Sequence, residues 1–291
     1  MANLKEIRNR ITSVSSTMQI TSAMKMVSAA KLKKAQDAIT AMRPYSEKLT
    51  ELLQNLSATL DEDSGSKYSD QREVNKVLVV AITSNRGLAG AFNSNIIKQA
   101  RALAADTYAG KQVDFMTIGK KGDDILKRFG TIIENDNDIF DALSFENASE
   151  IAQKLMDLFS EGEYDKIVVI YNHFKNAATQ LVMTEQFLPI LPPKPIEGQK
   201  ADTNDAFYIF EPSKEEIVEA LIPKSLKTQL FKALRDSVAS EHGARMTAMH
   251  KATDNATELR DELKLQYNKA RQAAITNEIL EIVGGAEALA G

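Results

Sequence analysis

The sequence predicts an α/β protein with a long antiparallel coiled coil, formed by its N- and C-terminal helices, and an α/β domain inserted between them. Apolar residues near both ends of the chain recur at alternating steps of three and four, which is the period of a helical seam. Those ends contain almost no glycine or proline, whereas the middle of the chain contains short apolar runs separated by turn residues. The first pattern indicates long helices, and the second indicates alternating strands and helices.

The first sixty residues show a heptad seam that no glycine interrupts, so we expect one helix of about 55 residues. Pro44 removes a backbone donor and crowds the carbonyl of Thr40, which predicts a bend near Arg43. The apolar seam positions are Leu4, Ile7, Ile11, Val14, Met18, Leu32, Ala35, Ile39, Met42, Leu49, Leu53, Leu56 and Leu60.

The middle of this helix departs from the apolar pattern. Thr21, Lys25 and Ser28 occupy seam positions where apolar residues are usual. Apolar side chains lie on the other faces instead, at Met24, Met26, Val27, Ala29 and Ala30. This stretch is therefore expected to present apolar surface away from its partner helix.

The C-terminal helix is predicted in two parts. A capping box, Ser213-Lys214-Glu215-Glu216, begins a short helix that Pro223 should kink or end. Between Pro223 and Val283 the only glycine is Gly243, so a second helix of roughly 60 residues can follow. Its apolar positions include Leu226, Leu230, Leu234, Val238, Met246, Met249, Ala252, Ala256, Leu259 and Leu263.

The middle segment reads as alternating strands and helices after a polar break at Asp61–Ser66. Strand, helix, strand is typical of a parallel, Rossmann-like sheet. Strands are expected at Lys76–Thr83, Val113–Ile118, Lys166–Tyr171 and Gln180–Leu188, with a stiff loop at Pro189–Pro195 and a short edge strand at Phe207–Phe210. Helices are expected at Leu88–Ala105, Lys121–Phe129 and Glu150–Phe159.

These elements divide the chain into an N-terminal coiled-coil helix (1–60), a Rossmann-like α/β domain (61–211) and a C-terminal coiled-coil helix (212–291). Neither terminal helix is expected to be stable alone, because most helical stability in water comes from packing an apolar stripe. One helix enters the middle domain by its C-terminal end and the other leaves it by its N-terminal end. They can project the same way only as an antiparallel pair.

Composition excludes several functions. There is no cysteine, so disulfides, thiolate metal sites and cysteine nucleophiles are excluded. A net charge of −4 argues against bulk nucleic-acid binding, although the first 34 residues carry seven basic residues against one acid and suit an acidic protein partner. We expect no targeting segment and no direct membrane insertion, because no apolar run reaches about 18 residues.

The loop Thr83–Gly90 joins a strand to a helix, a position at which many α/β proteins bind phosphate. It lacks both the Gly-Lys-Ser/Thr ending of a P-loop and the three-glycine dinucleotide spacing, so tight-turn glycines are the simpler interpretation. His173, His242 and His250 are not spaced as ligands of one metal ion. The residues indicate no catalytic, cofactor-binding or metal site.

Segments at both ends of the chain carry a specific resemblance to a known family. In the N-terminal helix they are Lys5-Glu6-Ile7-Arg8, Thr17-Met18-Gln19-Ile20-Thr21, Ala23-Met24-Lys25-Met26-Val27 and Ala30-Lys31. In the C-terminal helix they are Ser240-Glu241, Ala244-Arg245-Met246, Ala248-Met249, Ala252-Thr253-Asp254-Asn255-Ala256, Tyr267-Asn268, Ile275-Thr276-Asn277-Glu278, Glu281 and Gly285-Ala286. These segments resemble the gamma subunit family of F-type ATP synthases, of the bacterial type.

The resemblance implies a central rotor shaft without a catalytic site or cofactor of its own. The coiled coil is expected to enter a ring of alpha and beta subunits, while the α/β domain contacts the epsilon subunit and the membrane c-ring. Proton flow would turn the c-ring with the attached shaft, and the uneven shaft would bias each beta subunit in turn. The expected location is peripheral, at the cytoplasmic face of a bacterial cell membrane.

The resemblance also implies contact residues for the beta subunit. These are Met24, Arg245, Arg271, Gln272, Thr276 and Glu278, with Arg86 as a weaker candidate. The family usually has aspartate and cysteine where this chain has Asn85 and Ala89. Two alternatives stay open, a static coiled-coil adaptor and a phosphate- or nucleotide-binding α/β protein.

Overall fold

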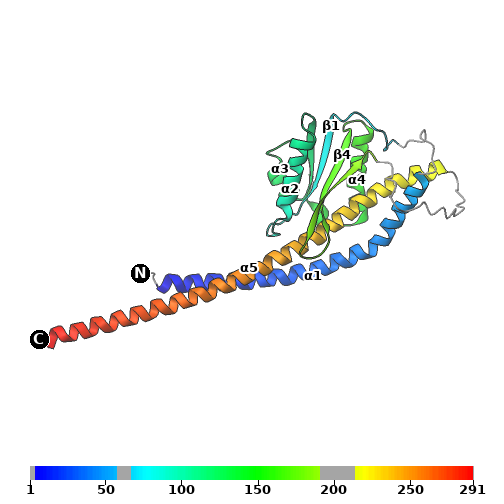
Figure 1. Cartoon of the computed structure of the whole chain (residues 1–291). Helices are drawn as coiled ribbons and strands as arrows, with labels where there is room; N and C mark the ends of the chain where they lie inside the picture. The colour runs from blue at the N-terminus through cyan, green and yellow to red at the C-terminus, as the bar shows by residue number, and fades with distance from the viewer. Residues whose placement is uncertain (1–3, 58–66, 191–213, 291) are drawn as a thin grey trace, which may run out of the picture. The chain divides into compact units, whose positions relative to one another are not determined.

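The computed structural model describes residues 4–57, 67–190 and 214–290 (Figure 1). The chain divides into two compact units, one made of Met1–Ala29 with Arg245–Gly291 and the other of Ala30–Ala244. Helices α1 (Leu4–Ser57) and α5 (Lys214–Ala290) each contribute to both units. The two long terminal helices that the seam pattern predicts are confirmed.

Both internal prolines lie inside continuous helices. Helix α1 stays helical through Pro44 and curves over its C-terminal part, in agreement with the predicted bend (Figure 1). Helix α5 continues through Pro223, so the separate short helix that was predicted does not form. Ile222 and Leu226, on either side of Pro223, are buried in the core. Burial of each such side chain stabilises the helix by about 2 kcal/mol, and together they offset the ~3 kcal/mol that an internal proline costs.

The described residues form a five-stranded sheet in the order β3-β2-β1-β4-β5. Strands β1 (Lys76–Ile82), β2 (Gln112–Ile118), β3 (Ile132–Asp136) and β4 (Lys166–Phe174) run parallel, and β5 (Gln180–Leu188) is antiparallel to β4. The expectation of a parallel sheet is therefore correct for four strands. A connection as short as residues 175–179 cannot make a parallel crossover, which explains the direction of β5.

Helices cover both faces of the sheet (Figure 1). Helices α2 (Phe92–Ala102) and α3 (Lys120–Leu126) pack on one face, where Ile96 and Leu126 join the core cluster of Val77 and Val79. Helix α4 (Phe145–Ser160) and the N-terminal part of α5 pack on the other, where Leu155 and Leu230 join the cluster of Leu78 and Val80. Two short elements complete the domain, a π-helical turn η1 (Leu103–Thr107) after α2 and a 3-10 turn η2 (Asp138–Phe140) before α4.

Several predicted boundaries are corrected by local backbone geometry. Helix α2 begins at Phe92 and not at Leu88, because Leu88 and Gly90 have φ values of 63° and 58°, which no right-handed helix allows. Helix α4 begins at Phe145, because the Ser144 hydroxyl caps it by accepting from the Asn147 amide. Strand β3 was not predicted at all.

Several other predictions lie outside the described residues. They are the polar break at Asp61–Ser66, the seam position Leu60, the loop beyond Ile190, the edge strand at Phe207–Phe210 and the capping residue Ser213.

Candidate functional site

Within the unit of Met1–Ala29 and Arg245–Gly291, α1 and α5 pair in opposite directions. As residue numbers rise along α1, those of the partners on α5 fall, so the pair is antiparallel, as predicted. Side-chain hydrogen bonds between the two helices include Arg8 Nη2 to Tyr267 Oη at 2.7 Å, Arg260 Nη1 to Met18 Sδ at 3.5 Å, and Thr21 Oγ1 with Thr253 Oγ1 at 2.8 Å.

The α5 seam differs from the prediction at two positions, because Thr253 and Arg260 lie on it in place of Ala252 and Leu259. Leu259 was expected on the seam, but it is 42% exposed, and Arg260 takes that place beside Met18. Steps of four and three then connect Met249, Thr253, Ala256, Arg260, Leu263 and Tyr267. The aliphatic stem of an arginine can cover a seam while its guanidinium reaches solvent, so an arginine is compatible with this site.

The polar middle of the α1 seam is confirmed. Thr21 and Ser28 are buried, while Met26 and Val27 are exposed and Met24 is half-buried. The Thr21 hydroxyl is satisfied by Thr253 and by the carbonyl of Met18. Helix α1 therefore presents apolar side chains outside its seam around the predicted contact residue Met24.

Four of the predicted contact residues lie together on the last part of α5. Arg271, Gln272, Thr276 and Glu278 are all exposed and lie beyond Tyr267, the seam residue that pairs with Arg8 near the start of α1. The Thr276 hydroxyl donates its hydrogen to the carbonyl of Gln272 at 2.9 Å. Toward a partner, the Thr276 oxygen can therefore act only as a hydrogen-bond acceptor.

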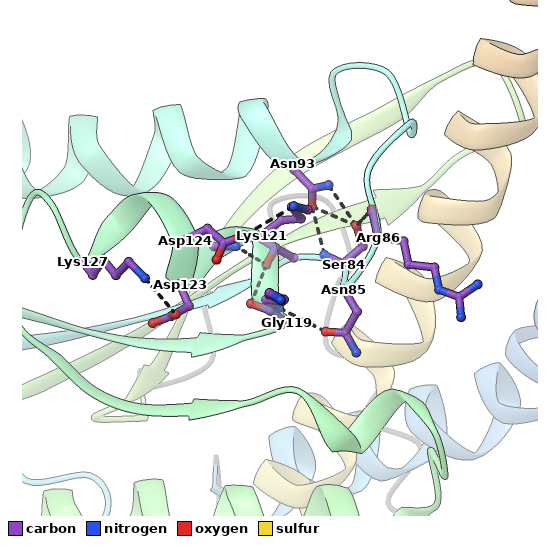
Figure 2. A network of polar contacts seen from close by, with 12 residues as sticks. Ser84, Asn85, Arg86, Asn93, Gly119, Lys121, Asp123, Asp124 and Lys127 are labelled. Carbon is purple, nitrogen blue, oxygen red and sulfur yellow. Dashed lines mark hydrogen bonds and ion pairs between the residues drawn. The ribbon is translucent and has the colours of Figure 1, made fainter.

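Two other predicted contact arginines, Arg245 and Arg86, do not lie on this end of α5. Arg245 lies on α5 but is only 8% exposed. Arg86 is exposed and belongs to the unit of Ala30–Ala244. Figure 2 shows its side chain pointing away from the polar network of its loop.

An exposed apolar stripe accompanies the contact residues and was not nominated from the sequence. A 3.6-residue period over residues 275–283 was the signal that could have found it. The stripe comprises Ile275 (47% exposed), Ile279 (54%), Leu280 (63%), Ile282 (71%) and Val283 (49%).

The loop after β1 is held by hydrogen bonds within the domain (Figure 2). The first amides of α3, at Lys120, Lys121 and Gly122, donate to Asn85 Oδ1 (3.1 Å), the Ser84 carbonyl (3.1 Å) and Thr83 Oγ1 (2.8 Å). The Ser84 amide donates to Asn93 Oδ1 at 2.9 Å. The amides at the start of α3, which could otherwise face a phosphate, are therefore already occupied.

The crevice that a doubly wound sheet offers to ligands is also filled. It lies at the carboxyl ends of β1 and β4, where the crossover helices change faces. Asn172 Nδ2 donates to the Phe92 carbonyl at 3.2 Å, and Ser240 Oγ on α5 donates to the Asn172 carbonyl at 2.9 Å. Ala244 packs with Ala89 and Phe92 over the same edge. These contacts disfavour the nucleotide-binding alternative.

Two histidines form carboxylate pairs at separate places. His173 Nδ1 lies 2.9 Å from Asp236 Oδ2, and His250 Nδ1 lies 3.2 Å from Asp254 Oδ2. Among the residues that the structure describes, no group of three or more histidine or acidic side chains could hold a metal ion. No described helix is long and apolar enough to cross a membrane.

Two buried tyrosines of the domain have pKa values raised above the ordinary value. Burial raises the pKa of Tyr171, whose hydroxyl donates to Glu185 Oε1 at 2.6 Å, and the negative charge of Glu185 raises it further. Burial likewise raises the pKa of Tyr164, which donates to Asp114 at 3.0 Å. Both hydroxyls stay protonated and serve as donors inside the domain.

Solved structures with the same architecture define the class of protein. A chain in the central stalk and c-ring structure of the Tetrahymena thermophila mitochondrial ATP synthase is 26% identical, with a TM-score of 0.61 over 80% of this chain and 99% of that chain. A chain from the Euglena gracilis mitochondrial ATP synthase shares the fold, with 22% identity and a TM-score of 0.69 over 98% of this chain and 94% of that chain. The fold is that of a central-stalk protein.

Sequence relatives identify the family. The ATP synthase family model matches residues 3–289. ATP synthase gamma chains from Flavobacterium psychrophilum, Flavobacterium johnsoniae and Christiangramia forsetii are 75%, 72% and 71% identical over the full length of both chains. The chain belongs to the ATP synthase gamma chain family. The predicted role as central shaft of an F-type ATP synthase is thereby confirmed.

Proposed function

We propose that the chain couples rotation of a membrane c-ring to conformational changes in catalytic beta subunits and performs no chemistry itself. The observation that carries the proposal is the exposed end of α5, where apolar and polar side chains extend past the start of α1 and no element in the described part of the chain covers them. An apolar stripe of this size on a helix marks a surface that a partner covers.

The order of residues on this end suits a contact that is both apolar and polar. Positions i, i+4, i+7 and i+11 lie on one helix face. Arg271, Ile275, Glu278 and Ile282 follow this spacing, and Gln272, Thr276, Ile279 and Val283 repeat it on the adjacent face. The first face alternates hydrogen-bonding residues with apolar ones, and the second has two hydrogen-bonding residues followed by two apolar ones. A partner loop could therefore pack on the apolar residues while the hydrogen-bonding residues fix its position.

The remaining proposed contacts differ in what they can contribute. Met24 lies beside the exposed Ile20 and Val27, which share its helix face, and it would add apolar contact. Arg245 is largely buried, so only a small part of its side chain could reach a beta subunit. Arg86 would make a second, separate contact from the loop after β1.

The partners follow from the proposed shaft role. The coiled-coil helices (1–60 and 212–291) would enter the ring of alpha and beta subunits, and the α/β domain (61–211) would contact the epsilon subunit and the c-ring. The chain would be a peripheral subunit at the cytoplasmic face of a bacterial cell membrane. We expect the isolated chain to bind no nucleotide, and calorimetric titration with ATP would reveal tight binding if the loop after β1 were a site.

A disulfide crosslink tests the contact and separates a rotating shaft from a static adaptor. Because the chain contains no cysteine, Gln272→Cys introduces a unique thiol. Oxidation against a cysteine in the beta-subunit loop should form a crosslink that stops ATP hydrolysis, and reduction should restore it. Thr107→Cys, on an exposed residue of the α/β domain, serves as the control and should not crosslink. Full, coupled hydrolysis in the crosslinked complex would establish the static adaptor.

A further inference from the structure

A single stripe of α5 faces the last two strands of the sheet and differs from the rest of the core. Steps of four and three connect its members, Gln229, Ala233, Asp236, Ser240 and Gly243. Gln229, Asp236 and Ser240 each make a polar side-chain contact with the strands. Among the described residues these are Gln229 Nε2 to Glu185 Oε2 (3.3 Å), His173 Nδ1 to Asp236 Oδ2 (2.9 Å) and Ser240 Oγ to the Asn172 carbonyl (2.9 Å).

The polar groups of this stripe are buried where apolar residues would normally be found. Asp236 is 2% exposed, Ser240 is fully buried and Asn172 is 1% exposed. Burying a carboxylate or a hydroxyl is unfavourable unless a partner satisfies it. Here the Asp236 carboxylate and the Ser240 hydroxyl each have a hydrogen-bond partner on β4. These buried groups are therefore satisfied, but they contribute less net stability than apolar side chains of the same shape would.

Hydrogen bonds resist rotation of the helix about its axis more strongly than apolar packing does. Apolar contacts are non-directional, whereas a hydrogen bond weakens beyond about 3.2 Å. A side-chain atom about 4 Å from a helix axis moves by about 1.4 Å when the helix turns by about 20°. Such a turn would break the bond from Ser240 to the Asn172 carbonyl while leaving most apolar contacts possible.

Gly243 fixes the same helix by close approach. A Cβ added there would lie 3.3 Å from Cα and O of Ala177 and 3.4 Å from Cε2 of Phe174. These distances are tighter than ordinary contacts, so a larger residue would push α5 away from the loop after β4. Hydrogen bonds at Asp236 and Ser240 and this close approach hold α5 at three successive turns.

We propose that these residues form a torsional joint that locks α5 to the α/β domain and passes torque into the helix. The joint is defined as Asn172, His173, Asp236, Ser240 and Gly243. It occupies the edge of the sheet at which related folds bind ligands, so the crevice serves as an attachment point. The proposal rests on the proposed shaft function, because only a rotating shaft needs torsional stiffness here.

The test measures torsional stiffness in the assembled ATP synthase. The end of α5 is locked to a beta subunit through the Gln272→Cys crosslink, and a rotational probe is attached at Ala109→Cys, on an exposed turn of the α/β domain. The angular variance of the probe reports the compliance between the two points. Asp236→Ala with Ser240→Ala removes the links from α5 to His173 and to the Asn172 carbonyl, so the variance should rise roughly twofold.

A matched control uses the same chemistry without the joint. His250 and Asp254 form an exposed histidine–aspartate pair within α5, so Asp254→Ala should leave the variance unchanged. If the double variant fails to assemble, Ser240→Ala alone deletes a single hydroxyl and should give an intermediate rise. A variance equal to that of the parent complex in every variant would overturn the joint. Absence of ATP-driven rotation in the uncrosslinked parent complex would instead overturn the shaft function.

Discussion

Helix α5 contains two stretches of similar composition with opposite environments. Between Leu226 and Ala244 most of its apolar side chains are buried, and Gln229, Asp236 and Ser240 have partners on β4 and β5. Between Arg271 and Val283 the apolar side chains are exposed. The first stretch stabilises and orients the helix, whereas the second contributes little to the fold and is available to another polypeptide. Mutations in the first stretch should therefore lower stability, and mutations in the second should impair function while leaving stability unchanged.

The largest expected difference compares two leucines of α5. Leu230 is fully buried in the core cluster, and Leu280 is 63% exposed. Leu230→Ala should lower the free energy of unfolding by about 3 kcal/mol, because it leaves a cavity beside β1 and α4. Leu280→Ala should change it by less than about 0.5 kcal/mol. Urea denaturation of the purified chain measures both, and equal losses would contradict the division of α5.

A charge in the seam of the helix pair should have the next largest effect. Ile11 is half-buried on the α1 seam, so Ile11→Asp places a charge against α5 and should lower the free energy of unfolding by about 2 kcal/mol. Ile20→Asp, on an exposed position of the same helix, is the control. An unchanged melting temperature for Ile11→Asp, measured by circular dichroism, would be incompatible with the pairing of the two helices.

The long helices were predictable because their signal is local and repeated. A seam of period three and four over dozens of residues leaves few alternatives, and Thr21 and Ser28 could be assigned to it although they are polar. The phase of α5 near Leu259 was harder, because an arginine occupies the seam and a leucine lies next to it. Sequence periodicity alone favours the leucine.

The elements that sequence reasoning missed depend on distant neighbours. Strand β3 ends in Glu134-Asn135-Asp136, and these polar residues become a strand only because β2 supplies the hydrogen-bonding edge. The joint at Asp236 and Ser240 was invisible, since its partners are more than 60 residues away in the chain. The proposed contact residues at Arg271–Glu278 came from family resemblance, because the groups that would give them a role would belong to other subunits.

A smaller effect, which changes at high pH, should follow from the buried Tyr171. Tyr171 has a folded pKa above its ordinary value of 10.0 because of burial and Glu185. Its contribution to stability is therefore fully present below pH 10 and is lost as the pH rises from there toward the folded pKa. Tyr171→Phe should lower the free energy of unfolding by about 1 kcal/mol at pH 8 and reduce the further loss between pH 10 and 11. Urea denaturation between pH 8 and 11 measures the free energy of unfolding of both chains. Tyr164 and Tyr108, whose pKa values burial also raises, should account for part of the loss that remains.

The smallest effect on the fold should belong to the residue with the clearest proposed role. Arg271 is exposed on the end of α5, so Arg271→Ala should change the free energy of unfolding of the chain by less than about 0.5 kcal/mol. A guanidinium that forms charge-assisted hydrogen bonds to a partner contributes roughly 1–3 kcal/mol, so coupling of ATP hydrolysis to rotation in the assembled complex should weaken measurably. Arg128→Ala, an exposed arginine of the α/β domain, is the matched control and should preserve both properties. Unchanged torque in Arg271→Ala would remove this residue from the contact, while a loss of chain stability would mean that the end of α5 is part of the fold after all.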